Sequence, residues 1–394
     1  MARTRMAWWL KVALWFSLGR LVTTAMVWVL MAQAGADTVA AAWTEFSNFS
    51  SHWDGRWYNL IAAAGYPNPI PTNAQGEVIE NAWAFLPVYP TLAAGLSWVT
   101  TLPWTVSAEI VSVVFAFGTA LLLYRMLVRS VPAQQAMFAV VLFSFAPVSP
   151  LYQFAYAESL QMFLIAVAIV LLQRRRYGWV IPVMVLLAFT RPGAIAFALA
   201  LGLLWIYRFA KRSHSRFTRG ERWALGLAAI TAGLSGMAWM LIAGIITGQP
   251  DAYLSTELAW RAAYIGRGEL LPFTPWISSA KWWSTAFGYP ELLGYVVLGI
   301  VIALAVVFMF LPQVKRLGVV IRFWLLGYGL YILAVFFPQS STMRILAPLF
   351  PALGAFAAPK SKLYRWAMVI LFVALQWWWL NTCWKVDTRD WTPP

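Results

Sequence analysis

The sequence predicts an all-α membrane protein whose helices cross a bilayer many times. Of its 394 residues, 61% are hydrophobic and 11% are charged, and the mean hydropathy is +0.69. Soluble domains carry about 25% charged residues. Apolar runs such as EIVSVVFAFGTALLLY and VVLGIVIALAVVFMFL are continuous, whereas a membrane β-barrel would show alternating segments of about ten residues.

The few cysteines and histidines exclude several classes of site. Cys383 is the only cysteine, so the chain has no internal disulfide and no cysteine-based metal cluster. His52 and His214 are too few and too far apart to indicate a zinc site. The net charge of +15 is explained by membrane orientation rather than by nucleic-acid binding, because Lys and Arg collect on the cytoplasmic side of membrane proteins.

The first expected helix follows a basic N-terminus. Its apolar part extends from about Met6 to Met31, which is too long for a typical cleaved signal peptide. We therefore interpret the segment as the first transmembrane helix, with the N-terminus in the cytoplasm.

The remaining helices follow from the Lys and Arg clusters, which lie near residues 3–11, 125–129, 174–176, 208–222, 315–322 and 360–365. An even number of crossings between consecutive clusters places all of them in the cytoplasm. The apolar segments that satisfy this condition are 8–32, 105–128, 134–150, 153–173, 177–190, 193–209, 222–247, 291–312, 318–337 and 343–357. About eleven spanning helices in a single integral membrane domain, residues 1–394, are expected.

One apolar stretch does not fit as a span. In AFLPVYPTLAAGLSWVT, Pro87 and Pro90 would break a helix at its start, and the remainder is short. We expect this stretch to dip into or lie along the outer leaflet. Residues 33–104 then form one large outer loop with interfacial helices, and residues 248–290 form a second.

Acidic residues point to chemistry on the outer side. By this topology the outer acids are Asp37, Glu45, Asp54, Glu77, Glu80, Asp251, Glu257, Glu269, Asp387 and Asp390, whereas Glu221 is cytoplasmic. Asp and Glu contribute little to setting topology, so their segregation is an independent observation.

Four ionisable residues fall inside the expected spans or at their ends: Arg20, Glu158, Arg191 and Arg344. Charges at membrane depth are costly unless paired or hydrated, and they usually mark function. Glu158, Arg191 and Arg344 belong to the outer half of the membrane, on the same side as Asp54. A structural ion pair between Glu158 and Arg191 is the plainer alternative. Arg20 lies nearer the centre, where a structural partner or snorkelling is expected.

An outward-facing pocket with carboxylates and guanidinium groups suits a sugar donor that carries a lipid phosphate. Arginine binds phosphate oxygens bidentately, and a carboxylate can accept the proton of an attacking hydroxyl. No Gly-rich loop precedes a helix, so a soluble nucleotide is not indicated. The outer acids form no cluster apart from Glu77 and Glu80, so we expect no metal and no other cofactor.

Five blocks resemble a known family in order and placement. They are HWDGRWYNLIAAAGYP, AFLPVYP, YAESL, TRPG and PQSSTMRILAPLFP. Together they resemble the PIG-V type mannosyltransferases, relatives of GPI mannosyltransferase 2 that include bacterial members and have the GT-C membrane fold. The resemblance covers about residues 10–360, and the TRPG block departs from the Arg-Ser-Asn-Gly of eukaryotic relatives.

The resemblance implies an inverting glycosyltransferase that uses a polyprenyl-phosphate hexose, above all mannose, without a metal. From the topology we expect it in the plasma membrane, with its active site on the outer face. The acceptor is a hydroxyl of a glycan, glycolipid or protein. Asp54 is then the general base and Glu158 its catalytic partner, while Arg191 and Arg344 bind the donor phosphate, and His52, Arg56 and Tyr66 orient the base or the acceptor. Two alternatives stay open: a lipid or solute transporter or scramblase, for which no inverted repeat is found, and a scaffold subunit of another transferase.

Overall fold

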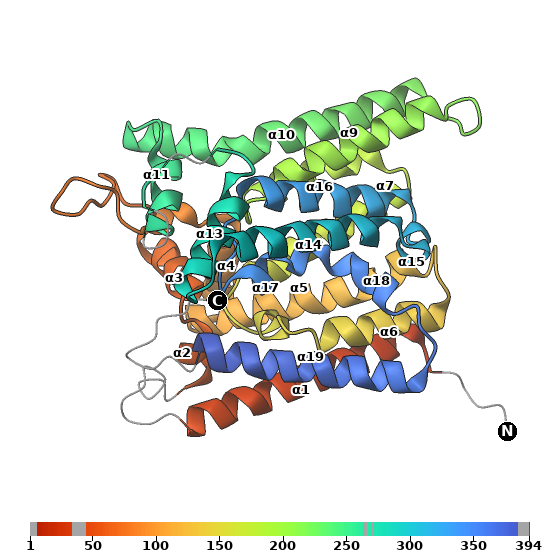
Figure 1. Ribbon diagram of the computed structural model, residues 1–394, viewed down its shortest axis with the longest axis horizontal. Helices are drawn as coiled ribbons and strands as arrows, with labels where there is room; N and C mark the ends of the chain where they lie inside the picture. Colours follow the sequence, from red (N-terminus) through yellow and green to blue (C-terminus); the bar gives the residue numbers. More distant parts are fainter. Residues whose placement is uncertain (1–5, 34–44, 263–265, 269–270, 385–393) are drawn as a thin grey trace. The chain divides into compact units, whose positions relative to one another are not determined.

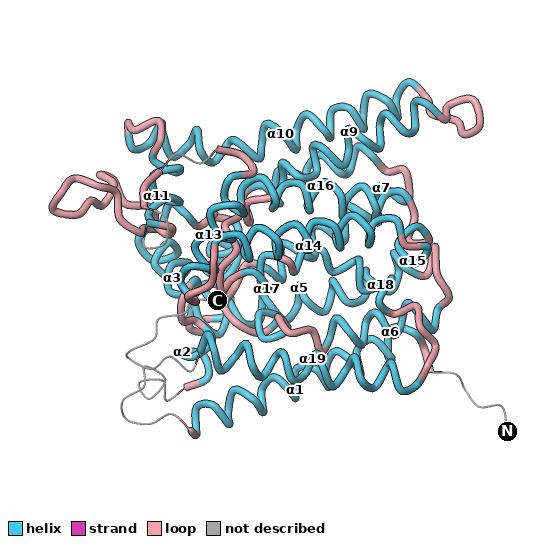
Figure 2. The backbone as a smooth tube through the Cα atoms, viewed as in Figure 1, coloured by secondary structure: helices cyan, strands magenta, loops and turns pink. Residues whose placement is uncertain are grey.

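A computed structural model describes residues 6–33, 45–262, 266–268, 271–384 and 394. These residues form helices, turns and loops, and none of them belongs to a β-strand (Figure 2). The prediction of an all-α protein is therefore confirmed. The outer acids Asp37, Glu269, Asp387 and Asp390, and residues 34–44 of the first outer loop, lie outside the described residues.

The chain divides into two compact units, each built from separate stretches of sequence. Unit 1 comprises residues 1–59, 89–170 and 340–394, and unit 2 comprises residues 60–88 and 171–339. Since Asp54, Glu158 and Arg344 all fall within unit 1, the geometry that relates them can be described within a single unit.

Unit 1 is a bundle of apolar helices. Its elements are α1 (Trp8–Ala32), α2 (Phe46–Ser50), the first part of α3 (Asp54–Ala64), α4 (Val88–Thr100), α5 (Trp104–Leu127), α6 (Ala133–Ser144), η3 (Ser149–Tyr152), α7 (Glu158–Gln173) up to residue 170, α17 (Thr342–Ile345), η5 (Ala347–Ala352), α18 (Leu353–Phe356) and α19 (Lys362–Trp384). Helix α1 packs against α6 and α5, and α19 lies beside it (Figure 1). A Cβ added to Gly19 of α1 would come within 2.2 Å of the Ser144 carbonyl oxygen, so only glycine allows this approach.

Arg20 strengthens the junction between α1 and α6. Its guanidinium donates to the carbonyl oxygens of Ser149 at 2.5 Å and Ser144 at 3.1 Å, and to Oε1 of Gln153 at 3.1 Å. The carbonyl of Ser144 is one of those that the C-terminus of a helix leaves without an intrahelical partner. These contacts favour the structural role expected for Arg20.

Unit 2 is built around α9. Its elements are the last part of α3, η2 (Ala82–Ala84), η4 (Tyr177–Trp179), α8 (Val180–Ala188), α9 (Ala194–Ala210), α10 (Arg219–Thr247), α11 (Ala252–Ala259), α13 (Thr274–Ala286), α14 (Glu291–Phe310), α15 (Pro312–Lys315) and α16 (Val319–Val335). Helix α9 packs against α10 and α16 (Figure 1). Thr218 and Glu221 form a capping box that starts α10, and Gly248, with φ of 70°, ends it.

Five described helices are long and apolar enough to cross a bilayer: α1, α5, α10, α14 and α19. They support an integral membrane protein. Six shorter apolar helical segments are Ala133–Ser144, Glu158–Gln173, Tyr177–Ala188, Ala194–Ala210, Val319–Val335 and Ala347–Phe356. Each overlaps one of the expected spans, while the total of about eleven stays a prediction.

Prolines account for the largest differences from the expected helices. The helix expected over 343–357 is divided into α17, η5 and α18, with Pro348 and Pro351 inside η5. The helix expected over 134–150 ends at Ser144, before Pro147 and Pro150. The next helix was expected to begin near Tyr152, but α7 begins at Glu158, because the chain first passes through η3 and a short irregular segment.

The two expected outer loops contain helices of their own. Residues 45–104 include α2, α3, η2 and the thirteen-residue α4, which begins at Val88, directly after Pro87. Residues 248–290 include α11 and α13. Both segments thus contain helices where the structure describes them, and their place on the outer side, like that of α4 along the outer leaflet, stays a prediction.

Candidate active site

Asp54 is the first residue of α3 and follows a tight turn. Helix α2 ends at Ser50, and the turn places Trp53 in the left-handed region with φ of 60°. The buried indole of Trp53 donates to the carbonyl oxygen of Cys383 at 2.8 Å. The side chain of Asp54 is 13% exposed. An acidic side chain suits a helix start, because the first N–H groups of the helix point toward it.

Glu158 starts α7, and its side chain is 1% exposed. Tyr156 lies two residues before Glu158 and connects this helix start to the turn that carries Asp54. Its hydroxyl donates to the carbonyl oxygen of His52 at 3.0 Å. From α5, the hydroxyl of Ser112 donates to the carbonyl oxygen of Tyr156 at 3.1 Å. Direct hydrogen bonds therefore fix the two acidic segments to each other.

Arg344 of α17 joins the two carboxylates. Its Nη1 donates to Oδ2 of Asp54 at 2.5 Å, and its Nε forms an ion pair with Oε1 of Glu158 at 3.5 Å. The guanidinium lies 5.9 Å from the ring centre of Tyr156, and the Arg344 side chain is 12% exposed. Three residues singled out in distant parts of the sequence thus meet at one place, and we name them the acid–arginine trio.

The trio is nearly buried and carries two negative charges against one positive charge. Buried charges are costly unless they are paired, and removing one partner of a buried pair leaves an uncompensated charge. Arg344 therefore offsets the repulsion between the two carboxylates and allows them to lie close together. Within unit 1, the ion-pair partner of Glu158 is Arg344. The alternative pair of Glu158 with Arg191, which belongs to unit 2, stays a prediction.

His52 and Arg56 lie beside the trio in sequence and differ in environment. The imidazole of His52 packs edge-on against Trp53, with 4.9 Å between ring centres. Burial, with a further contribution from the positive charge of Arg56, lowers the pKa of His52 from 6.5 to about 4. His52 is therefore neutral at pH 7. Arg56 is exposed, and its guanidinium lies 6.0 Å from the ring centre of Trp57.

Arg191 and Tyr66 belong to unit 2 and are described there. Arg191 lies in the turn between α8 and α9, whose last residue, Gly193, has φ of 127° and so favours glycine. The Tyr66 ring stacks on Trp83 with 4.6 Å between ring centres, and its hydroxyl donates to the carbonyl oxygen of Phe85 at 2.9 Å. These contacts are typical of core packing, and both expected substrate roles stay predictions.

Glu109 is a residue that the sequence analysis missed. It is the only acidic residue of α5, a helix that is otherwise apolar enough to span a membrane, and it accepts a hydrogen bond from the hydroxyl of Ser50. The signal that could have found it is the same one that identified Glu158, an acid within an apolar run.

The described residues offer no site for a metal ion of the usual kind. Within them, no three His, Cys, Asp or Glu side chains lie close enough together to hold a metal. Independence of metal nevertheless stays a prediction about activity.

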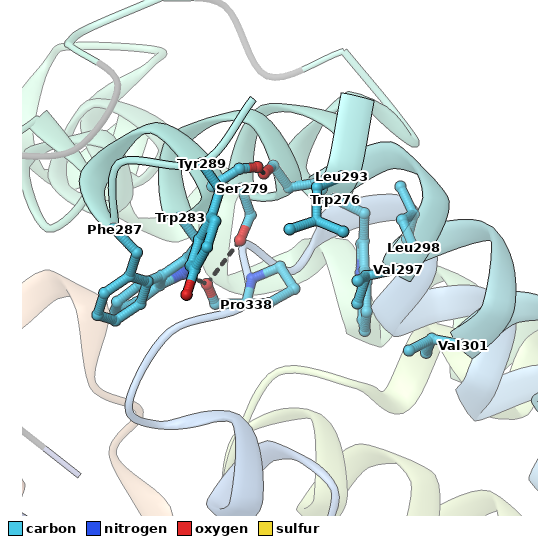
Figure 3. Close-up of a pocket in the computed structure, with 13 residues that line it drawn as sticks. Trp276, Ser279, Trp283, Phe287, Tyr289, Leu293, Val297, Leu298, Val301 and Pro338 are labelled. Atoms are coloured by element: carbon cyan, nitrogen blue, oxygen red, sulfur yellow. Dashed lines mark hydrogen bonds between the residues drawn. The ribbon is translucent and has the colours of Figure 1, made fainter. Parts of the chain in front are cut away.

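Unit 2 contains an apolar groove between α13 and α14, with a volume of about 290 Å³ (Figure 3). None of its lining side chains is charged. Ser279 and the indole of Trp283 both donate to the carbonyl oxygen of Pro338 at 2.8 Å, which fixes one wall. The groove lacks the acid and base groups that the trio provides, so it is not a candidate for the chemical step.

Solved structures, rather than family models or curated proteins, are similar to this chain. No family model matches the chain, and no curated protein matches it. Among solved structures, the chain is similar to the archaeal oligosaccharyltransferase AglB from Archaeoglobus fulgidus, in complex with an inhibitory peptide and a dolichol-phosphate. The TM-score is 0.43 and the sequences are 11% identical. The match covers 96% of this chain and 56% of AglB, so this chain spans little more than half the length of that protein.

Proposed function

We propose that the protein is a GT-C type membrane glycosyltransferase that moves a hexose, mannose in the first instance, from a polyprenyl-phosphate donor to a hydroxyl of a glycan, glycolipid or protein. The acid–arginine trio is the observation that supports this proposal. It combines a carboxylate at the start of α3, a second carboxylate at the start of α7 and a guanidinium within one nearly buried cluster. The resemblance of the surrounding sequence blocks to the PIG-V type mannosyltransferases suggests the donor and the sugar.

In the proposed reaction, the acceptor oxygen attacks the anomeric carbon of the donor sugar. The bond between that carbon and the phosphate oxygen breaks, and the lipid phosphate leaves with the bonding electrons. Asp54 takes the proton of the attacking hydroxyl, which is the role of a general base. A single displacement of this kind inverts the configuration at the anomeric carbon.

Arg344 has two tasks in this proposal. It orients Asp54 and offsets the repulsion between the two carboxylates, a task that its contacts within the trio support. It also contacts the departing phosphate, because a guanidinium presents five donors in a planar fork and can serve more than one anion. Arg191 of unit 2 is the second proposed phosphate ligand, and neutral His52 orients the base or acceptor without adding charge.

The proposed reaction takes place on the outer face of the plasma membrane. The positions of the Lys and Arg clusters in the sequence support a cytoplasmic N-terminus and an outer position for the segment that carries Asp54. A lipid-linked donor suits this location, since it needs no soluble nucleotide.

The proposal is tested with the purified protein in lipid nanodiscs, radiolabelled mannosyl polyprenyl phosphate and a synthetic mannoside with free hydroxyl groups. We expect a labelled disaccharide, at the same rate with or without EDTA. Movement of the labelled donor across vesicles without disaccharide would instead indicate a scramblase, and binding without turnover would indicate a scaffold. Loss of turnover in EDTA that Mg²⁺ or Mn²⁺ restores would overturn the metal-free mechanism.

A further inference from the structure

Glu109 lies on a polar face of α5 that contacts the segments carrying Asp54 and Glu158. Glu109 and Ser112 are three residues apart and therefore share one face of the helix. Ser112 bonds to the carbonyl oxygen of Tyr156, and its own oxygen lies 2.9 Å from the hydroxyl of Tyr89. Glu109 accepts from Ser50, which is fully buried. The two residues of α5 thus reach the two acidic segments separately, Ser112 toward Glu158 and Glu109 toward Asp54.

The contact between Glu109 and Ser50 fixes the end of α2 four residues before Asp54. The backbone of Ser50 is held as well, because the N–H of Ala155 donates to its carbonyl oxygen at 3.2 Å. A Cβ on Gly55, directly after Asp54, would come within 3.2 Å of the Ala155 carbonyl oxygen. The chain is therefore in close contact with its surroundings on both sides of Asp54, at Ser50 and at Gly55. Glu109 accepts the side-chain hydrogen bond at Ser50, where the turn begins.

The cost of placing Glu109 in an apolar helix argues for a specific role. An acidic residue in a spanning helix costs several kcal/mol unless it is paired or hydrated. Apart from Glu109, only Arg125 is charged in α5, and it lies sixteen positions further on, in the last turn. Glu109 is partly buried, and the group that donates to its carboxyl oxygen is the hydroxyl of Ser50 rather than a cation. A neutral residue would suffice for packing alone.

We propose that Glu109 is a positioning residue for Asp54, acting through Ser50. This inference rests on the proposed function, because it concerns the same base. The Glu109 carboxylate accepts a hydrogen bond from the Ser50 hydroxyl. This contact fixes the turn before α3, so that the Asp54 carboxylate stays within hydrogen-bond distance of Arg344. Glu109 itself exchanges no proton with the acceptor.

The test compares variants that keep or remove this hydrogen bond. Glu109→Gln retains an oxygen acceptor, whereas Glu109→Ala and Ser50→Ala remove the contact. In Glu109→Ala the Ser50 hydroxyl can still donate to the carbonyl oxygen of Ser47, at 3.1 Å, so the protein should fold. Ser107→Ala is the matched control, because Ser107 is a buried serine of the same helix whose hydroxyl has no hydrogen-bond partner within the described residues.

We expect Glu109→Ala and Ser50→Ala each to lower kcat by about tenfold, since small misplacements of a catalytic group are costly, with an unchanged donor KM. Glu109→Gln and Ser107→Ala should keep the parent rate. Because both residues act through one contact, the double variant Ser50→Ala/Glu109→Ala should be no slower than the slower single variant. A Glu109→Gln variant as slow as Glu109→Ala would overturn the inference, since the charge of Glu109 would then matter. A double variant whose loss of kcat equals the product of the two single losses would also overturn it.

A second readout does not depend on transfer activity. Hydrogen exchange of peptides covering residues 46–57 should become faster in Glu109→Ala than in the parent and should not change in Ser107→Ala. Unchanged exchange in both variants would reject the positioning role even if the parent is an active transferase. Faster exchange in a protein that transfers no sugar would support the contact and reject the proposed function alone.

Discussion

Arg20 and Arg344 are both partly buried arginines of unit 1, but they hold different kinds of partner. Arg20 donates to two carbonyl oxygens and one amide oxygen near the end of α6. Arg344 contacts two carboxylates, from the starts of α3 and α7. Carbonyl groups are fixed parts of the backbone and take no proton at neutral pH, whereas a carboxylate can accept one. The ligands of a buried arginine therefore indicate whether it serves the fold or the chemistry.

The largest expected effect is that of Asp54→Asn. Asparagine keeps the size of the side chain and an oxygen that can accept from Arg344, but it cannot take the proton of the acceptor. We expect turnover to fall by about 10²–10⁴-fold, with thermal stability close to that of the parent. The rate of disaccharide formation and the melting temperature of purified protein measure the two quantities, and more than about a tenth of parental turnover would remove Asp54 from the base role.

Arg344→Lys is expected to have the next largest effect. Lysine keeps the charge but not the planar fork, so one ammonium group cannot reproduce both the contact with Asp54 and that with Glu158. We expect turnover to fall by at least about tenfold while the melting temperature barely changes. A raised donor KM would indicate the phosphate contact, and a lower kcat alone would indicate positioning. Parental kinetics would exclude both tasks and direct the search for the phosphate ligand to Arg191.

Arg20→Lys applies the same chemical change to the other arginine and should give the opposite result. Lysine cannot serve the carbonyl oxygens of Ser144 and Ser149 and the amide of Gln153 together. Loss of one charge-assisted hydrogen bond costs about 2 kcal/mol, so we expect a lower melting temperature and normal turnover per folded molecule. If this variant is stable but inactive, the proposed distinction between the two arginines is wrong.

The smallest expected effect concerns His52 and pH. Its pKa is about 4 in the folded protein against 6.5 in an unfolded chain, so the unfolded state binds the proton more readily. This contribution to stability is complete above pH 6.5 and is lost as the pH falls toward 4. We expect His52→Gln to melt at a temperature that depends less on pH in this window than that of the parent. Identical pH profiles for the two proteins would show that His52 is not buried as described.

The sequence indicated much of this arrangement, for physical reasons that differ between residues. Asp54, Glu158 and Arg344 were conspicuous because charges are rare in apolar segments. Their pairing was not predictable, since Arg191 was an equally plausible partner for Glu158 and nothing in the sequence reports distances between segments. Glu109 was missed because a single acid near the start of a long apolar helix resembles an ordinary helix end.

The helices, too, were only partly predictable from the sequence. Hydrophobic runs indicated α1, α5 and α14 within two residues at each end. The expected helix over 343–357 failed because the effect of Pro348 and Pro351 was underestimated, and these prolines leave Arg344 in a four-residue helix. Proline limits a helix locally, whereas the alternatives that the chain then adopts depend on tertiary packing.

The stereochemistry of the product tests the central claim most directly, because a base-assisted single displacement by Asp54 permits only one outcome. The measurement is the NMR determination of the anomeric configuration of the disaccharide formed by purified protein from a mannosyl polyprenyl phosphate of known configuration. Our account predicts inversion in every product molecule, and no product above background with Asp54→Asn. Retention of configuration would contradict it, since a retained centre requires a covalent or shielded intermediate and a carboxylate that acts as something other than a base.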